Sequence, residues 1–213
     1  MARGGSTAGS TPQPALSANA RSLLAALDAH GALHLNSTPR FPNVTDIGGS
    51  WADVMELIEA KLCFLSRLVL GKTTYMSLRL YAACAALAPA SRALDAQTAA
   101  DPLVPELYRL LEDAGPLATD ELALMLAVDT KRVRHALAWL QQGLYVTVFG
   151  PQRHLNPNWD TYGWCTRTQW EQACPLPLDP PGRPQARERL ASALGPYLSE
   201  RQVNRTIALL ERR

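Results

Sequence analysis

The chain has 213 residues, with 21 Lys and Arg against 19 Asp and Glu, so its formal net charge is only +2. A chain of this length can bury a substantial core, in one domain or in two small ones. The charge balance is too even for a protein that coats nucleic acid without selectivity, so any basic surface must be local. No apolar run is long enough to span a bilayer, and the N-terminus lacks the apolar core of a signal peptide. We therefore expect a cytoplasmic protein with no membrane partner.

The cysteines give no indication of a metal site. Cys63, Cys84, Cys165 and Cys174 form no CxxC pair and show no Cys/His ligand spacing. We therefore expect no metal, and no sequence motif indicates another cofactor. Cys63 and Cys84 lie in apolar segments and are expected to be buried thiols, which fits a reducing compartment.

The first part of the chain predicts a tail and a small mixed module. Residues 1–16 are rich in Gly, Ser, Thr and Pro and are expected to be disordered. Apolar residues recur at helical spacing over residues 17–30, and Ser50 is the predicted N-cap of a second helix. Two apparent strands, FLSRLVL and TTYMS, precede a predicted helix over residues 78–87. This order predicts a winged-helix-like module over residues 17–88.

A second module is predicted over residues 100–170, and its central part reads PLATDELALMLAVDTKRVRHALAWLQQGLYVTVFG. After a helix over residues 105–114, Thr119 is the predicted N-cap of a short helix. Asp129 is the predicted cap of the next helix, over residues 130–142. Two short helices joined by a tight turn and followed by strands are typical of a winged helix-turn-helix.

A hairpin is predicted to follow Gly143, which ends the second of these helices. Residues 144–149 form a β-rich apolar run, and residues 159–164 are an aromatic run that could return beside it. The polar residues 152–154 lie between the two runs, so they are expected on a loop. A loop tipped with Arg and His can reach phosphates or a minor groove.

The helix over residues 130–142 carries the predicted binding site. One face is apolar, and the whole helix contains no acid, as expected of a helix that lies against phosphates. Double-stranded DNA is therefore the predicted partner. The predicted DNA-contacting residues are Thr130, Lys131, Arg132, Arg134, His135 and Gln142 on the helix and Gln152, Arg153 and His154 on the loop. Trp139 flanks the polar face and is expected to pack against a neighbouring module.

The C-terminal part is predicted to contain a proline-rich linker over residues 171–184 and two helices over residues 185–213. Ser199 and Gln202 have the spacing of a capping box at the second of these helices. Together the elements predict a mainly α protein with small β-hairpins, an α+β fold built of tandem winged-helix modules.

Three stretches resemble the AlkZ-like family: SWADVMELIEAKL, RLVLGKTTYMSLRLY and PLATDELALMLAVDTKRVRHALAWLQQGLYVTV. Their spacing is similar to that of the family's shorter, AlkZ-related members, and the resemblance covers about residues 17–170. It implies stacked winged-helix modules and a DNA partner. It also implies a relation to DNA glycosylases that excise alkylated bases and unhook interstrand crosslinks without a metal or other cofactor.

Catalysis in the resembled glycosylases depends on a Gln-x-Gln or Gln-x-Asp motif near the N-terminus. This chain departs from that pattern, because Gln13 is the only glutamine before Gln97, and Gln141 and Gln142 are adjacent. We therefore predict no catalytic residue. Asp46 and Asp53 are acids in the corresponding region, but such acids more often cap a turn or a helix.

Three functions are consistent with the sequence. We expect a non-catalytic DNA-binding protein associated with the nucleoid, acting in transcription regulation or as a binder of DNA structure or lesions. The first alternative is a monofunctional DNA glycosylase in DNA repair that uses an unrecognised water-positioning residue. The second is a protein-interaction scaffold, which the nearly neutral net charge favours.

Overall fold

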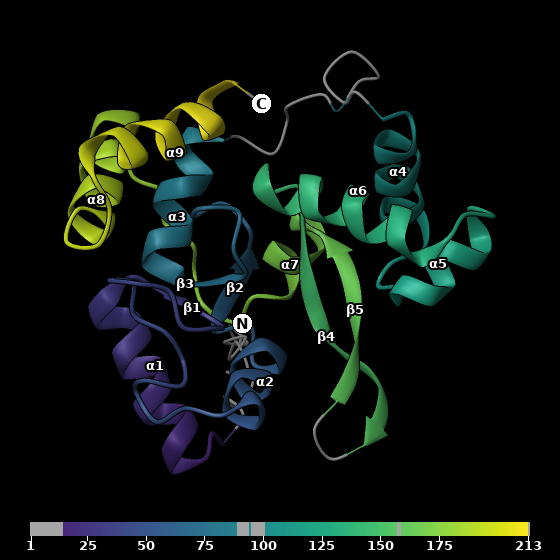
Figure 1. The fold of residues 1–213 in the computed structure, drawn as a ribbon, viewed down its shortest axis with the longest axis horizontal. Helices are drawn as coiled ribbons and strands as arrows, with labels where there is room; N and C mark the ends of the chain where they lie inside the picture. The colour runs from purple at the N-terminus through teal and green to yellow at the C-terminus, as the bar shows by residue number, and fades with distance from the viewer. Residues whose placement is uncertain (1–14, 89–93, 95–100, 157–158, 213) are drawn as a thin grey trace, which may run out of the picture.

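The computed structural model describes residues 15–88, 94, 101–156 and 159–212. Within these ranges the chain forms helices around two small antiparallel sheets, which confirms an α+β fold (Figure 1). The predicted disordered tail lies outside the described residues except for Ala15 and Leu16. Most of the connection between residues 88 and 101 lies outside them too.

The N-terminal part is built on a three-stranded sheet with the strand order β1-β3-β2. Its elements in chain order are α1 (Ala18–His30), β1 (Ala32–His34), α2 (Trp51–Glu59), β2 (Cys63–Ser66), β3 (Thr74–Ser77) and α3 (Leu78–Leu87). Ser50 caps α2 as predicted, within a capping box in which Ser50 and Asp53 satisfy each other's backbone N–H groups.

Two features of this sheet differ from the sequence prediction. β1 was not predicted, and its pairing partner is β3, about forty residues later, with Leu33 opposite Tyr75. β2 and β3 are shorter than the predicted runs, because residues 67–73 leave the sheet as a turn. Leu70 and Gly71 adopt φ values of 54° and 68° there, a left-handed conformation that suits glycine and costs leucine some strain.

The second part of the chain has the predicted order of three helices and a hairpin. Its elements are α4 (Leu103–Ala114), α5 (Thr119–Met125), α6 (Thr130–Gln142), β4 (Val146–Asn156) and β5 (Trp159–Thr166). α6 has the predicted bounds. The Asp129 carboxylate caps it by accepting the Arg132 backbone N–H at 2.9 Å. The interpretation of these elements as one of two tandem winged helices stays a prediction.

The predicted cap of α5 is wrong. Thr119 is the first residue inside the helix and Ala118 takes the N-cap position, where its backbone N–H donates to the Glu121 carboxylate at 2.7 Å. The Thr119 hydroxyl instead accepts the indole N–H of Trp164 at 3.0 Å. The side chain that was expected to cap the helix therefore fastens it to β5.

The predicted loop over residues 152–154 is also wrong. β4 continues through this segment to Asn156 and pairs with β5, with Arg153 opposite Thr161 and His154 opposite Asp160. Three register shifts absorb the irregular residues, one of them between Val148 and Gly150. The strand bends at these bulges instead of ending, so the hairpin is longer than the sequence suggested.

The C-terminal segment contributes three helices, α7 (Arg167–Ala173), α8 (Arg183–Leu194) and α9 (Glu200–Arg212). α7 lies where the proline-rich linker was expected to begin, with Thr166 as its cap. Trp170 of α7 is fully buried and packs edge-to-face against the stacked rings of Phe64 and Tyr81, at ring-centroid distances of 5.0 and 5.1 Å. At the start of α9 the Gln202 side chain accepts the Ser199 backbone N–H at 2.9 Å, one half of the predicted capping box.

Two apolar clusters hold the elements together. The first joins α1 and α2 to α4, α5, α6 and the hairpin, and the second joins α3 to α7, α8 and α9. Each cluster mixes residues from early and late parts of the chain. Within the described ranges, no helix has both the length and the apolar character needed to cross a bilayer.

Candidate nucleic-acid interface

α6 presents the surface on which the binding prediction rests. Val133, Ala136, Leu137 and Leu140 are buried and pack against α4, α5 and β4. The opposite side of the helix is exposed because burying one apolar stripe leaves a polar stripe in solvent. The predicted residues on that exposed side are Thr130, Lys131, Arg132, Arg134 and His135.

The basic side chains of α6 are not equivalent. The Arg132 guanidinium lies 3.7 Å from the Asp101 carboxylate, so an acid at the start of α4 partly neutralises it. Among the described residues, no acid lies within ion-pair distance of Lys131 or Arg134. Lys131 and Arg134 therefore carry the uncompensated positive charge of this face.

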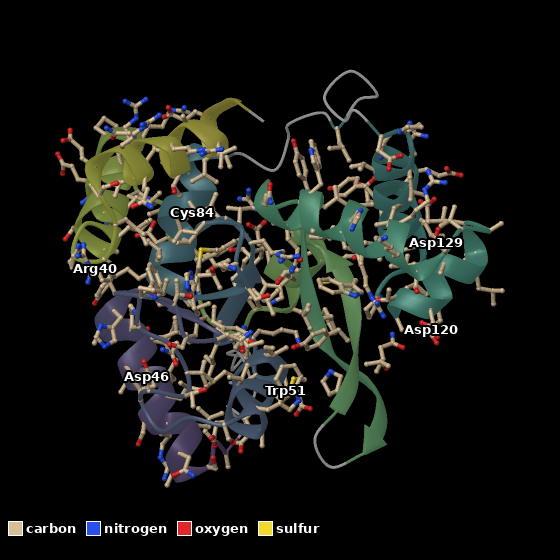
Figure 2. All side chains as sticks on the ribbon, in the orientation of Figure 1. Arg40, Asp46, Trp51, Cys84, Asp120 and Asp129 are labelled. Atoms are coloured by element: carbon tan, nitrogen blue, oxygen red, sulfur yellow. The ribbon has the colours of Figure 1, made fainter. Side chains whose placement is uncertain are left out.

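One acid stands at the N-terminal end of α6. Asp129 is exposed, and the hydrogen bond from the Arg132 backbone N–H lowers its pKa below the usual value for a carboxyl group. Figure 2 shows Asp129 and Asp120 on the side of the molecule opposite Arg40. Because Asp129 is held by the helix end, a ligand on the exposed face of α6 would meet the cations Lys131, Arg132 and Arg134 over the first turns of the helix.

Gln142 lies at the other end of the helix, about 18 Å from Thr130 at 1.5 Å per residue. It is half-buried and lines a cleft of about 420 Å³ together with Arg67, Gly71, Gln202 and Arg205. We call this the Gln142 cleft. The structure therefore does not gather all the predicted helix residues in one place, because Gln142 lies at the far end of the helix, beside the β2–β3 turn and α9.

The predicted hairpin residues also separate. Gln152 is exposed, but its amide donates to the Pro116 carbonyl at 2.8 Å and its side chain covers Gly163. This contact gives Gln152 a role in holding the hairpin against the segment before α5. The side chains of Arg153 and His154 lie outside the described residues, so their contribution to binding stays a prediction.

Two residues that fix the hairpin escaped the sequence analysis. The Lys61 ammonium donates to the carbonyls of Phe149 at 2.6 Å and Glu59 at 3.1 Å, and it lies 4.0 Å from the centre of the Phe149 ring. The Thr147 hydroxyl accepts the Leu65 N–H at 3.2 Å and donates to the Leu65 carbonyl at 2.9 Å. Both contacts join β4 to the N-terminal part, and no local pattern marks them.

Trp139 packs against the core, but its ring partner is not in a neighbouring module as predicted. Its half-buried ring stacks on Tyr145 with centroids 5.9 Å apart and planes 11° from parallel. Tyr145 belongs to the segment that joins α6 to β4, not to a neighbouring module. Trp139 therefore stabilises the end of α6 beside the exposed stripe.

The acids considered as replacements for a catalytic glutamine are engaged in local structure. Asp46 accepts a hydrogen bond from the Asn43 amide at 2.5 Å, within a turn, and Asp53 belongs to the capping box of α2. Figure 2 shows Asp46 in the N-terminal part, far from Asp129. Within the described ranges, no group of three His, Cys, Asp or Glu side chains could hold a metal ion.

These observations define a mixed α+β protein with a capped, acid-free helix exposed beside a long hairpin. The sequence model of the family described as AlkZ related matches residues 44–205. The chain belongs to this AlkZ-related family, and the family connects it with DNA. No curated protein and no solved structure matches the chain.

Proposed function

We propose that this protein binds double-stranded DNA through α6 and does so without excising bases, as a regulator or as a binder of DNA structure or lesions. The observation that carries the proposal is the exposed face of α6, where Lys131 and Arg134 have no described acid within ion-pair distance. Membership of the AlkZ-related family supports DNA as the partner.

The geometry favours a helix docked on the duplex, with the winged-helix interpretation placing α6 in the major groove. Each Lys or Arg that neutralises a phosphate releases counterions, so affinity falls as salt rises, with a slope of about 0.9 per contact in a log–log plot. The hairpin, fastened by Lys61 and Thr147, would present a second, rigid element to the backbone.

The test is a double charge reversal, Lys131→Glu/Arg134→Glu, measured by fluorescence anisotropy on a plain duplex over a salt series. Losing two phosphate contacts lowers the salt slope by about 2 and weakens binding at 0.1 M salt by at least about 60-fold. Arg132 is left unchanged because Asp101 already compensates it.

A matched control removes the same charge elsewhere. Arg21 on α1 and Arg40 are exposed, and Figure 2 shows Arg40 on the side of the molecule opposite Asp129. Arg21→Glu/Arg40→Glu changes the net charge by the same amount as the α6 variant. We expect the control to bind much more tightly than the α6 variant. Equal losses in the two variants would mean that only overall charge matters, and no binding by the wild type at low salt would favour the scaffold alternative.

Family membership keeps base excision as a second candidate. The engagement of Asp46 and Asp53 in a turn and a cap weighs against it, because both carboxylates already accept hydrogen bonds from neighbouring groups. Release of free base from alkylated or crosslinked duplex under single-turnover conditions decides the question. Measurable release would replace the non-catalytic part of the proposal.

A further inference from the structure

The exposed stripe of α6 does not end at the helix terminus. Lys131, His135, Ala138 and Gln142 follow one another at intervals of three or four residues, so they lie on one side of the helix. Over this length the helix rises about 17 Å, which corresponds to roughly five base-pair steps of duplex. At its far end Gln142 leads directly into the Gln142 cleft.

The cleft combines three separate segments around a set of hydrogen-bond donors. Arg67 comes from the turn between β2 and β3, Gln142 from α6, and Gln202 and Arg205 from α9. Among the described residues that line it, none is acidic. In Figure 1 the end of α6 approaches the β2–β3 turn beside α3 and α9.

The two arginines of the cleft differ in burial and in how firmly their side chains are held. The Arg67 side chain is half-buried, and its Nε donates to the Gly71 carbonyl at 3.1 Å, which fixes the guanidinium. Gly71 has a positive φ, and the Gln142 amide nitrogen lies 3.8 Å from the place that a Cβ on Gly71 would occupy. Arg205 lies on α9 and is exposed, as is Arg201 one turn earlier in the same helix.

Glu211, the acid at the C-terminal end of α9, is paired with arginines of α8. Glu211 accepts hydrogen bonds from Arg187 at 2.7 Å and from Arg183 at 3.4 Å, both on α8. Its charge is therefore compensated on the α8 side of the helix. The Gln142 cleft keeps a net positive charge with planar amide and guanidinium donors, a set suited to phosphate oxygens.

We infer that the Gln142 cleft is a second contact site for the phosphodiester backbone of the same duplex that α6 binds, held chiefly by Arg67 and Arg205. This inference rests on the proposed function. It extends the DNA footprint from α6 onto the N-terminal part and the C-terminal helix. The chain then contacts the duplex with elements from three regions of the sequence.

The experiment compares Arg67→Ala/Arg205→Ala with the wild type on the same duplex and salt series. Two lost phosphate contacts lower the slope by about 2 and weaken binding at 0.1 M salt by about 60-fold, independently of DNA sequence. Arg21→Ala/Arg40→Ala is the matched control and should retain the wild-type slope. Since Arg67 also supports its turn, Arg205→Ala alone serves as the variant on an exposed helix face, with an expected slope change of about 1.

The outcomes separate the two proposals. If Lys131→Glu/Arg134→Glu abolishes binding while both cleft variants keep the wild-type slope, this inference is overturned and the proposed function stands. If the wild type binds no duplex at low salt, both are overturned. A last measurement adds inorganic phosphate and follows the melting temperature of the protein. If phosphate raises this temperature in the wild type but not in Arg67→Ala/Arg205→Ala, and the same variant keeps the wild-type salt slope for DNA binding, the cleft binds a free anion. The inference then fails.

Discussion

The buried cation of α7 offers the sharpest test of the packing. Arg167 is 6% exposed, and its Nε donates to the Glu171 carboxylate at 2.8 Å. Its guanidinium also donates to the Ala88 carbonyl and lies 5.7 Å from the centre of the Tyr81 ring. The Tyr81 hydroxyl donates to the same Glu171 oxygen at 2.5 Å, and burial raises the pKa of Tyr81.

Replacing Arg167 with Met keeps the bulk of the side chain and removes its charge and donors. Breaking a buried pair by removing one partner costs about 3–5 kcal/mol. The Glu171 side chain is 27% exposed, so solvent screens the remaining carboxylate and the lower end, about 3 kcal/mol, applies. For a chain of this size that loss lowers Tm by about 6–12 °C.

The assay is thermal unfolding of Arg167→Met followed by circular dichroism, with Arg187→Met as the control. Arg187 also pairs with a glutamate, Glu211, but its side chain is 55% exposed, so its pair is worth about 0–1 kcal/mol. A Tm loss in Arg167→Met no larger than that in the control would refute the reasoning. A double variant with Glu171→Leu should recover part of the loss, because the uncompensated carboxylate is gone.

Two further predictions concern stability. Burial, and secondarily the charge of Lys72, lowers the pKa of His34 from 6.5 to about 4, so the folded state loses stability as pH falls from 6.5 towards 4, by up to about 1.4 kcal/mol per pH unit. Unfolding of His34→Gln should depend less on pH over that interval, and an unchanged pH dependence would contradict the assignment. Lys61→Met removes the donor to the Phe149 carbonyl and should cost about 1–3 kcal/mol in urea unfolding, whereas Lys72→Met, at an exposed position, should cost less than about 0.5 kcal/mol. Equal effects of the two lysine substitutions would show that the contact to Phe149 contributes nothing.

Elements fixed by nearby residues could be predicted from the sequence. α6 follows from Asp129 as its cap and from an apolar stripe that repeats at helical spacing, both of which lie within the segment itself. α3 and the cap of α2 were predicted on the same grounds. These signals are local, so they can be recognised without any knowledge of the tertiary structure.

Features that depend on distant partners could not be predicted. β1 has only three residues and exists as a strand because β3 pairs with it. β4 continues through Gly150 and Pro151 because both pair with β5, opposite Gly163 and Tyr162. The Thr119 hydroxyl would suit a cap, but the indole N–H of Trp164 reaches it from another element. The position of Gln142 follows from α9 lying beside the end of α6, which no periodicity within α6 reveals.

The bond between Leu65 and Thr147 has a consequence for the synthesis of the chain. The Leu65 backbone on the edge strand β2 is satisfied by a side chain 82 residues later. At 5–20 residues per second, the ribosome takes about 4–16 s to produce that segment. During this interval the edge of β2 at Leu65 lacks its partner, and an unpaired strand edge can associate with other chains. The nascent chain therefore exposes this strand edge to association from the synthesis of β2 until the hairpin can pair with it.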